Sequence, residues 1–116
     1  MENQPSNSEN TVTYQSKDFI GTITLNRPLK RNALNTKVWD ALNQAIEMAE
    51  QDPEARVVMV RGMGKSFCAG LDLSPENEIF ATFSKPPNAS QKQQLFEEVR
   101  KIQGIHTRLE KLSKPT

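Results

Sequence analysis

Three features of the sequence have residue types that can do chemistry: the run Gly64-Lys65-Ser66, the single cysteine Cys68 and the single histidine His106. A glycine-lysine-serine run holds a phosphate when it closes a longer glycine-rich loop and opens a helix. That motif needs another glycine five positions before Gly64, and Met59 stands there instead. The run therefore does not predict a nucleotide-binding loop.

Neither Cys68 nor His106 has neighbours in the sequence that indicate a reactive site. A nucleophilic cysteine needs a partner that lowers its pKa or takes its proton, and no such partner is evident beside Cys68. We interpret Cys68 as a small apolar residue of the interior. His106 falls on a helical apolar stripe without further metal-ligating residues, so we expect a packing or surface role and no metal site.

The composition restricts the class of protein. The chain has 116 residues, enough for one small domain, and 35% of them are hydrophobic. We expect residues 1–12, which are polar, to form a disordered tail, and residues 13–116 to form the domain. The charge is balanced, with 15 basic and 14 acidic residues. Such a balance favours neither nucleic acid nor a membrane surface as a partner.

The sequence also suggests a compartment. One cysteine allows no internal disulfide, which suits a reducing environment. No apolar run approaches the roughly 18 residues of a membrane span. The residues before Lys17 include no basic side chain, which argues against a secretory signal or an arginine-rich transit peptide. We expect a cytoplasmic protein, while a mitochondrial or peroxisomal location stays open for a full-length relative.

The hydrophobic pattern predicts a strand, a helix and a second strand in succession. Residues 19–25 alternate threonine with isoleucine and leucine, which predicts a strand, and Tyr14 belongs to a preceding strand of a hairpin. Asn35 is a predicted N-cap of a helix that ends near Gln51. Its apolar stripe consists of Val38, Leu42, Ala45 and Ala49. Residues 55–61 form a continuous apolar run, which predicts a strand buried on both faces.

The second half of the chain is less regular. We expect a short strand over residues 65–67, a short helix within 74–82 and a linker over 84–90. A last helix should begin near Ser90, with Gln93 as its capping-box partner. Its expected apolar face consists of Leu95, Val99, Ile102, Leu109 and Leu112. Because the predicted parallel sheet has little cover, we expect the sequence to be cut from a longer one.

Two segments carry a more specific pattern: ITLNRPLKRNAL at residues 23–34 and VVMVRGMGKSFCAGLDL at residues 57–73. Together, in this order and with a helix between them, they closely resemble two amino-terminal signatures of the enoyl-CoA hydratase/isomerase (crotonase) family. The resemblance covers residues 13–73 well and continues more loosely to Thr116. The stretch after Leu73 is most similar to the dienoyl-CoA isomerase branch.

The resemblance implies a fold and an activity. The fold is α/β, a partial crotonase (ClpP/crotonase-like) ββα fold with a βαβ core at residues 20–61, truncated before the second oxyanion loop. Family members hydrate or isomerise acyl-CoA thioesters and stabilise the enolate-like oxyanion with two backbone N–H groups. One of these would be the N–H of Leu71, presented by the tight turn that Gly70 allows. Coenzyme A enters as part of the substrate, and no other cofactor or metal is implied.

The resemblance also implies a coenzyme A site made of two segments. The loop at residues 31–33 would meet the nucleotide end of the ligand, with Lys30 and Arg31 supplying positive charge. The segment at residues 69–73 would line the adenine pocket, and Asp72 would also cap a short helix. The residues implied as substrate-binding are Arg31, Asn32, Ala33, Ala69, Gly70, Leu71, Asp72 and Leu73.

The sequence departs from the family in one respect that bears on activity. The second oxyanion donor and the acid and base carboxylates of family members lie further along the chain, and residues up to Thr116 include none of them. The resemblance therefore implies that this polypeptide alone is inactive. It also implies that full-length relatives would be trimers or hexamers. Two alternatives stay open: a non-catalytic acyl-CoA-binding or interaction module derived from the family, and an unrelated small α/β interaction domain.

Overall fold

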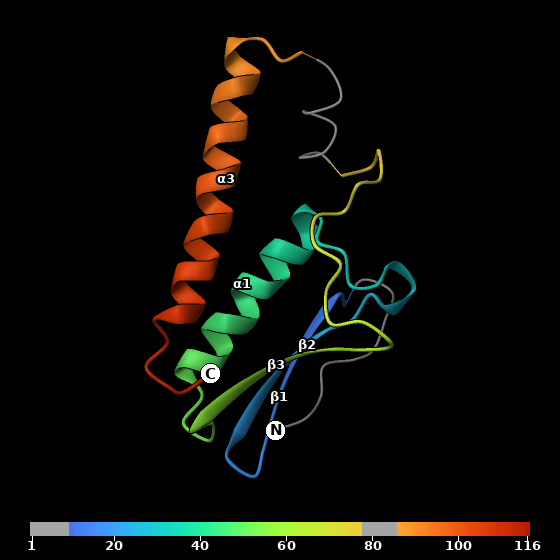
Figure 1. The fold of residues 1–116 in the computed structure, drawn as a ribbon. Coiled ribbons are helices and arrows are strands. Elements are labelled where there is room, and N and C mark those ends of the chain that lie inside the picture. The colour runs from blue at the N-terminus through green and yellow to red at the C-terminus, as the bar shows by residue number, and fades with distance from the viewer. Residues whose placement is uncertain (1–9, 78–85) are drawn as a thin grey trace.

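The computed structural model describes residues 10–77 and 86–116, and within them the chain forms a three-stranded sheet and two long helices (Figure 1). The elements in chain order are β1 (Val12–Lys17), β2 (Ile20–Leu25), the 3-10 helix η1 (Pro28–Lys30), α1 (Thr36–Gln51), β3 (Val57–Gly62) and α3 (Ala89–Glu110). The strand order is β1-β2-β3. Strands β1 and β2 pair antiparallel, as the predicted hairpin requires, while β2 and β3 pair parallel across α1.

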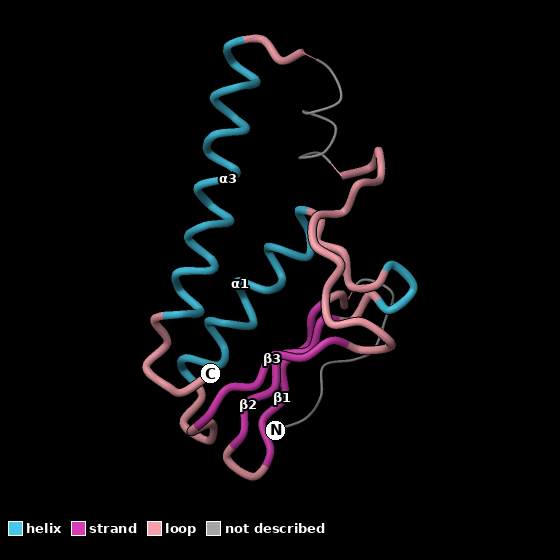
Figure 2. The backbone as a smooth tube through the Cα atoms, viewed as in Figure 1, coloured by secondary structure: helices cyan, strands magenta, loops and turns pink. Residues whose placement is uncertain are grey.

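The elements stack in layers, with α1 against the sheet and α3 against α1 (Figures 1 and 2). The main apolar cluster joins β1, β2, β3, α1 and one residue of α3. Its members are Val12, Tyr14, Ile23, Leu25, Leu34, Val38, Trp39, Leu42, Ala45, Ile46, Ala49, Val58 and Ile105. This core holds β2 and β3 in a fixed relation, and each of the two signature segments continues from one of these strands into the irregular chain that follows it.

The prediction for α1 is confirmed in detail. Asn35 has an extended backbone, and its Oδ1 accepts a hydrogen bond of 3.0 Å from the N–H of Val38. This bond satisfies one of the N–H groups that the first helical turn leaves without a partner. All four residues of the predicted apolar stripe are buried. The helix ends at Asp52 and Pro53, where the chain turns toward β3.

Polar contacts close the carboxyl end of α1. The hydroxyl of buried Tyr14 donates to Oδ2 of Asp52 at 2.7 Å. This bond, above all, lowers the pKa of Asp52 below its ordinary value, and burial raises the pKa of Tyr14. The ammonium of Lys114 donates to the carbonyl oxygens of Ala49 and Asp52, at 2.6 and 2.7 Å. A cation at this place compensates carbonyls that the last helical turn leaves without partners.

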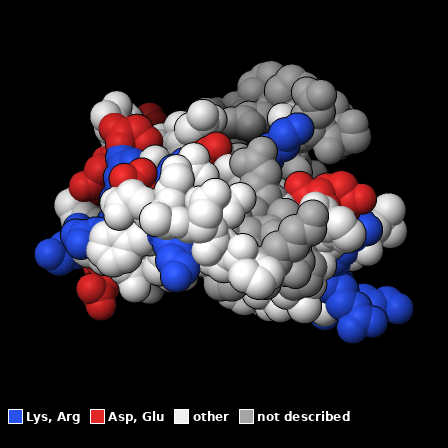
Figure 3. Space-filling model, turned by 90° about the horizontal axis from the view of Figure 1, so that it is seen from above, with Lys and Arg blue, Asp and Glu red and all other residues white. Residues whose placement is uncertain are grey.

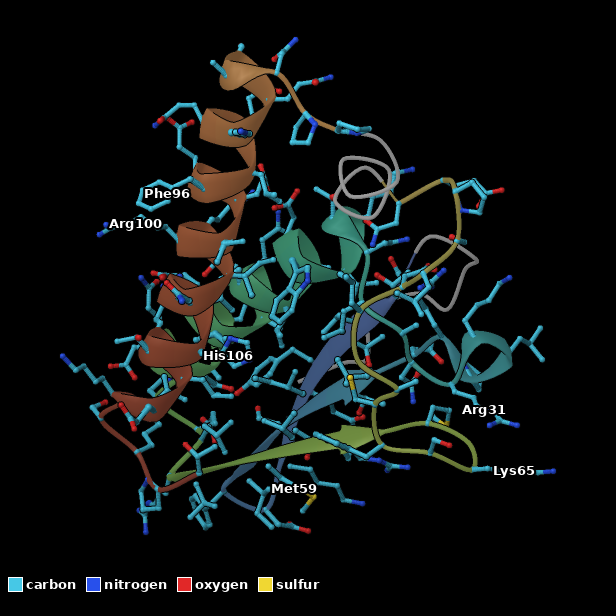
Figure 4. The ribbon with its side chains drawn as sticks, turned by 45° about the horizontal axis from the view of Figure 1, so that its top comes forward. Arg31, Met59, Lys65, Phe96, Arg100 and His106 are labelled. Atoms are coloured by element: carbon cyan, nitrogen blue, oxygen red, sulfur yellow. The ribbon has the colours of Figure 1, made fainter. Side chains whose placement is uncertain are left out.

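The prediction that β3 is buried on both faces is wrong. Val57 and Met59 are 42% and 45% exposed, whereas Val58 between them is buried. In Figure 4, Met59 projects away from the two helices. Among the described residues, β3 is an edge strand. One of its faces is uncovered by them, because the buried side chain of Val58 points to the opposite side of the sheet. A continuous apolar run does not show how many faces are covered.

The predicted cap of the last helix is displaced by two residues. Asn88 is the N-cap of α3 and forms the capping box with Gln91, so Ser90 and Gln93 lie inside the helix. Asparagine caps a helix at least as well as serine, and Asn88 stands earlier. The predicted apolar face also omitted Ile105, which is the buried residue of α3, and included Val99, which is 39% exposed.

Other sequence predictions fall on irregular or undescribed parts of the chain. Residues 65–67 form no strand, and residues 74–77 form a turn that precedes the undescribed range 78–85. The expected helix within 74–82 and the expected linker at 84–90 therefore lie partly outside the described residues. The expected polar tail does so too, at residues 1–9, and its last residue, Val12, begins β1.

A first prediction concerns the close approach of β2 to its neighbours at Gly21. A Cβ at this position would clash with the Tyr14 hydroxyl and lie 3.0 Å from the Cβ of Ala55. We expect Gly21→Ala to lower the free energy of unfolding by about 1–3 kcal/mol. The matched control is Gly104→Ala in α3, where an added Cβ meets nothing within 4 Å. It should raise stability by about 0.5–1 kcal/mol. Urea unfolding followed by Trp39 fluorescence measures both, and equal effects would contradict this view of the hairpin.

Candidate functional site

The two signature segments lie side by side in the structure. The N–H of Ala69 donates to the carbonyl of Arg31 at 2.9 Å, and the N–H of Leu34 donates to the carbonyl of Gly70 at 2.7 Å. The N–H of Asp72 donates to the carbonyl of Leu34 at 2.9 Å. Residues 31–34 and 69–72 thus run parallel, with Leu34 and Leu71 as a bridge pair.

This pairing sets the direction of the Leu71 N–H. In a trans peptide the C=O and the N–H point in opposite directions. Because the Gly70 carbonyl accepts from Leu34, the Leu71 N–H points away from Leu34. Within residues 10–77 and 86–116 it makes no hydrogen bond. Among the described residues it is therefore a donor without a partner, on an otherwise anchored peptide.

Gly70 shapes the space beside this donor. Its φ is +90°, a backbone conformation that favours glycine. A Cβ built on Gly70 would meet nothing within 4 Å, so its side of the chain is open. The open side allows another molecule to approach the backbone closely. Leu71 itself is partly buried against the main apolar cluster.

The side chain of Asn32 is committed to internal hydrogen bonds. It is 1% exposed, and its backbone has a φ of +58°. Its Oδ1 accepts from the N–H of Arg27 at 2.7 Å. Its Nδ2 donates to the carbonyls of Met63 and Ser66, at 3.0 and 2.9 Å. Asn32, implied above as substrate-binding, therefore joins the first signature to the turn after β3 and does not present its side chain to solvent.

Asp72 is likewise turned inward and is 6% exposed. Its Oδ2 lies 3.1 Å from Nη1 of Arg27, and its Oδ1 accepts from the N–H of Ser74 at 2.8 Å. The hydrogen bond from Ser74, with that from Arg27, lowers the pKa of Asp72 below its ordinary value. Asp72 caps a turn here, and residues 72–77 contain no helix for it to cap. Arg27 was absent from the residues implied by the sequence.

The other implied residues are more accessible. Arg31, Ala69 and Leu73 are exposed, and Ala33 and Gly70 are partly buried. Lys30 is exposed beside Arg31, and so is Lys65 in the turn after β3. Figure 4 shows Arg31 and Lys65 projecting on the same side of the molecule.

Lys65 is a candidate that sequence reasoning missed, because Gly64-Lys65-Ser66 was considered only as a phosphate-binding loop. The turn that carries it packs on the first signature through Asn32. We call these three exposed bases, Lys30, Arg31 and Lys65, the basic cluster, because the segments that carry them are joined through Asn32. The face seen from above carries both acidic and basic side chains (Figure 3).

The two residues considered first for chemistry have modest surroundings. Cys68 is half-buried against the core, and its Sγ lies 3.4 Å from the N–H of Gly70. His106 is exposed; its Nδ1 lies 3.0 Å from the Ile102 carbonyl, and its ring packs on Trp39 with centroids 5.2 Å apart. In the part of the chain that the structure describes, no group of three or more potential metal ligands is found. No helix in that part is long and apolar enough to cross a membrane.

Comparison with known sequences gives a consistent result. The pattern of the family described as enoyl-CoA hydratase/isomerase matches residues 15–107. The mitochondrial Delta(3,5)-Delta(2,4)-dienoyl-CoA isomerase of Mus musculus is 31% identical over 94% of this chain. A probable 3-hydroxyisobutyryl-CoA hydrolase of Arabidopsis thaliana is 37% identical over 68% of this chain. The probable enoyl-CoA hydratase EchA14 of Mycobacterium tuberculosis is 47% identical over an aligned region that covers 47% of this chain. The chain spans 33%, 27% and 22% of these relatives, respectively.

Solved structures agree on the fold. An enoyl-CoA hydratase from Shewanella pealeana superposes with a TM-score of 0.79 at 19% identity, over 94% of this chain and 38% of that one. An enoyl-CoA hydratase/isomerase from Xanthobacter autotrophicus superposes with a TM-score of 0.74 at 30% identity, over 91% of this chain and 36% of that one. The expected α/β fold, a partial crotonase fold, is thereby confirmed.

A second prediction tests the role of Asn32. We expect Asn32→Asp to lower the free energy of unfolding by about 1–3 kcal/mol, because the carbonyls of Met63 and Ser66 lose their donor. The matched control is Asn88→Asp, where the exposed side chain caps α3 through its oxygen alone and an aspartate keeps that bond. Thermal unfolding measures both variants. A destabilisation at position 88 as large as that at position 32 would contradict the assignment.

Proposed function

Because the chain belongs to the enoyl-CoA hydratase/isomerase family, we propose that it acts in acyl-CoA thioester chemistry, with the Leu71 N–H as a donor to the thioester oxygen. The observation that supports this most strongly is the Leu71 N–H, which has no hydrogen-bond partner within residues 10–77 and 86–116 and lies beside the open side of Gly70. In the hydration or isomerisation of an enoyl-CoA, negative charge develops on that oxygen. A donor aimed at it stabilises the transition state more than the substrate.

The anchoring of the donor supports this role. The peptide between Gly70 and Leu71 is held through its carbonyl by Leu34, and the next peptide is held through the N–H of Asp72. A peptide fixed on both sides needs no reorganisation when charge develops on the ligand. Such preorganisation is the main advantage of a protein donor over water.

The basic cluster supports recognition of the coenzyme A part. Lys30, Arg31 and Lys65 are exposed and carry no carboxylate partner in the described residues. Positive side chains of this kind pair with phosphate oxygens. We propose that Ala69 and Leu73, also exposed, contact the adenine end. Asn32 and Asp72 would contribute by holding the two loops together, and coenzyme A arrives with the substrate.

A third prediction is that the 116 residues alone do not turn over an enoyl-CoA. One oxyanion donor fewer costs about 10²–10³ in rate, and missing acid–base groups cost another ~10²–10⁴. We expect no measurable loss of the conjugated absorbance of 2-butenoyl-CoA, although the ligand binds. Binding without turnover also fits a non-catalytic acyl-CoA-binding module derived from the family. Turnover by the purified chain would contradict the prediction.

A fourth prediction tests the donor itself. Leu71→Pro removes the N–H, whereas Leu71→Ala keeps it while also losing the leucine side chain that packs against the core. We expect Leu71→Pro to weaken 2-butenoyl-CoA binding roughly three- to tenfold relative to Leu71→Ala, as for the loss of one hydrogen bond. Free coenzyme A lacks the thioester carbonyl and should bind both variants alike. Calorimetry measures these affinities, with Trp39 fluorescence as the folding control. Equal thioester affinities would contradict the assignment of Leu71.

A fifth prediction tests the basic cluster. Arg31→Glu should weaken coenzyme A binding roughly fivefold, about 1 kcal/mol, and the effect should shrink with added salt. The matched control is Lys17→Glu, an exposed change of the same charge at the end of β1, opposite the first residue of β2. Calorimetry at two salt concentrations compares them. If the Lys17 variant loses as much affinity, overall charge and not the cluster governs binding.

A further inference from the structure

We infer that Arg27 is a positioning residue that orients and polarises the Leu71 N–H through two intervening peptide groups. The inference rests on the proposed function, since it concerns the strength of that donor. Arg27 makes no contact with the proposed ligand in this scheme. Its side chain is 17% exposed and lies between the two signature segments.

The first link joins Arg27 to the loop of the first signature. Nη1 of Arg27 donates to the carbonyl oxygen of Ala33 at 2.6 Å. That oxygen belongs to the peptide whose N–H is on Leu34. Because the peptide is trans, this N–H points away from the guanidinium.

The second link joins the two signatures. The Leu34 N–H donates to the Gly70 carbonyl at 2.7 Å, and that carbonyl shares a trans peptide with the Leu71 N–H. The Arg27 guanidinium, the Ala33–Leu34 peptide and the Gly70–Leu71 peptide are thus connected head to tail, and the series ends at the Leu71 N–H. Every hydrogen bond in the series points from Arg27 toward Leu71.

The common direction makes the bonds cooperative. Each bond polarises the next peptide and strengthens its N–H as a donor, by about 10–30% per bond in condensed phases. The series begins at a permanently charged group, since arginine does not lose its proton in proteins. The free N–H of Leu71 should therefore be a stronger donor than an isolated peptide N–H, and its direction is determined by the bonds behind it.

Asp72 holds Arg27 in position. Its Oδ2 takes a second hydrogen bond from the same Nη1, at 3.1 Å. Its Oδ1 is occupied by the Ser74 N–H and its own N–H by the Leu34 carbonyl, so the carboxylate has little freedom. In the part of the chain that the structure describes, this carboxylate is the charged group in contact with Arg27, and it offsets part of the guanidinium charge. The hydrogen bond from Arg27 to the Ala33 carbonyl still orients that peptide group when Asp72 neutralises part of the guanidinium charge.

The test compares Arg27→Met with Arg27→Lys, which restores the charge, and with Arg56→Met as a control. Arg56 is exposed and stacks on the ring of Phe19, at the far end of β2. In the ligand-free chain, the NMR coupling through the hydrogen bond between Leu34 N and the Gly70 carbonyl carbon reports the relay directly. We expect it to fall in Arg27→Met, to recover in part in Arg27→Lys and to be unchanged in Arg56→Met.

A second readout concerns the ligand. The infrared stretch of carbonyl-labelled acetyl-CoA shifts to lower frequency when a donor polarises the thioester. We expect Arg27→Met to reduce this shift and to weaken binding by about twofold, less than the loss expected for Leu71→Pro, because the hydrogen bond to the thioester is weakened and not removed. Arg27→Lys should recover part of both effects. Should Arg27→Met not fold, Arg27→Gln, which keeps a neutral donor, takes its place.

The outcomes separate the two proposals. If the unaltered chain binds no acetyl-CoA, the proposed function is wrong, while the coupling still tests the relay. If the chain binds and the coupling and the infrared shift are the same in Arg27→Met, the relay is wrong and Arg27 only stabilises the fold. A loss of stability alone, with an unchanged infrared shift in the folded fraction, overturns the inference as well.

Discussion

The arrangement of the site depends on one hydrogen bond, from the N–H of Leu34 to the carbonyl of Gly70. It joins segments that are 36 residues apart and determines which way the next N–H points. Other contacts serve the same junction. Asn32 ties its loop to the turn after β3, and Arg27 reaches both segments at once. Without this bond the Leu71 peptide could rotate, and its N–H would have no defined target.

The junction is rigid because the elements that carry it are rigid. The first segment leaves β2 and the second leaves β3, and these neighbouring strands end at the same edge of the sheet. Helix α1 packs on β1 and β2 through its apolar face, and Val58 of β3 belongs to the same apolar cluster. The Lys114 ammonium donates to carbonyls at the carboxyl end of α1. Loops supplied by neighbouring parallel strands are a common place for a site, since the sheet positions them without ordering them separately.

Internal and external residues of the site divide by function. Asn32, Asp72 and Arg27 are largely buried and bond to each other or to the backbone, so they organise the loops. Lys30, Arg31 and Lys65 are exposed and remain available to an anion. Buried organising residues and exposed basic residues are neighbours in the sequence, and only their burial in the structure distinguishes the two groups. A buried, fully bonded amide or carboxylate is expensive to disturb, which is why these residues hold the site and do not sample solvent.

The sequence alone determined the hairpin and α1 with its Asn35 cap, because these follow from local patterns of apolar residues and caps. It singled out the two signature segments by their resemblance to a family, and the structure shows that residues 31–34 and 69–72 pair. The sequence did not determine that β3 has an uncovered face, since Val57 and Met59 are as apolar as Val58. The sequence also did not indicate a role in the site for Arg27 or Lys65. It did not show that the side chains of Asn32 and Asp72 are buried. Those features come from contacts between residues far apart in the chain, and only the tertiary structure sets such contacts.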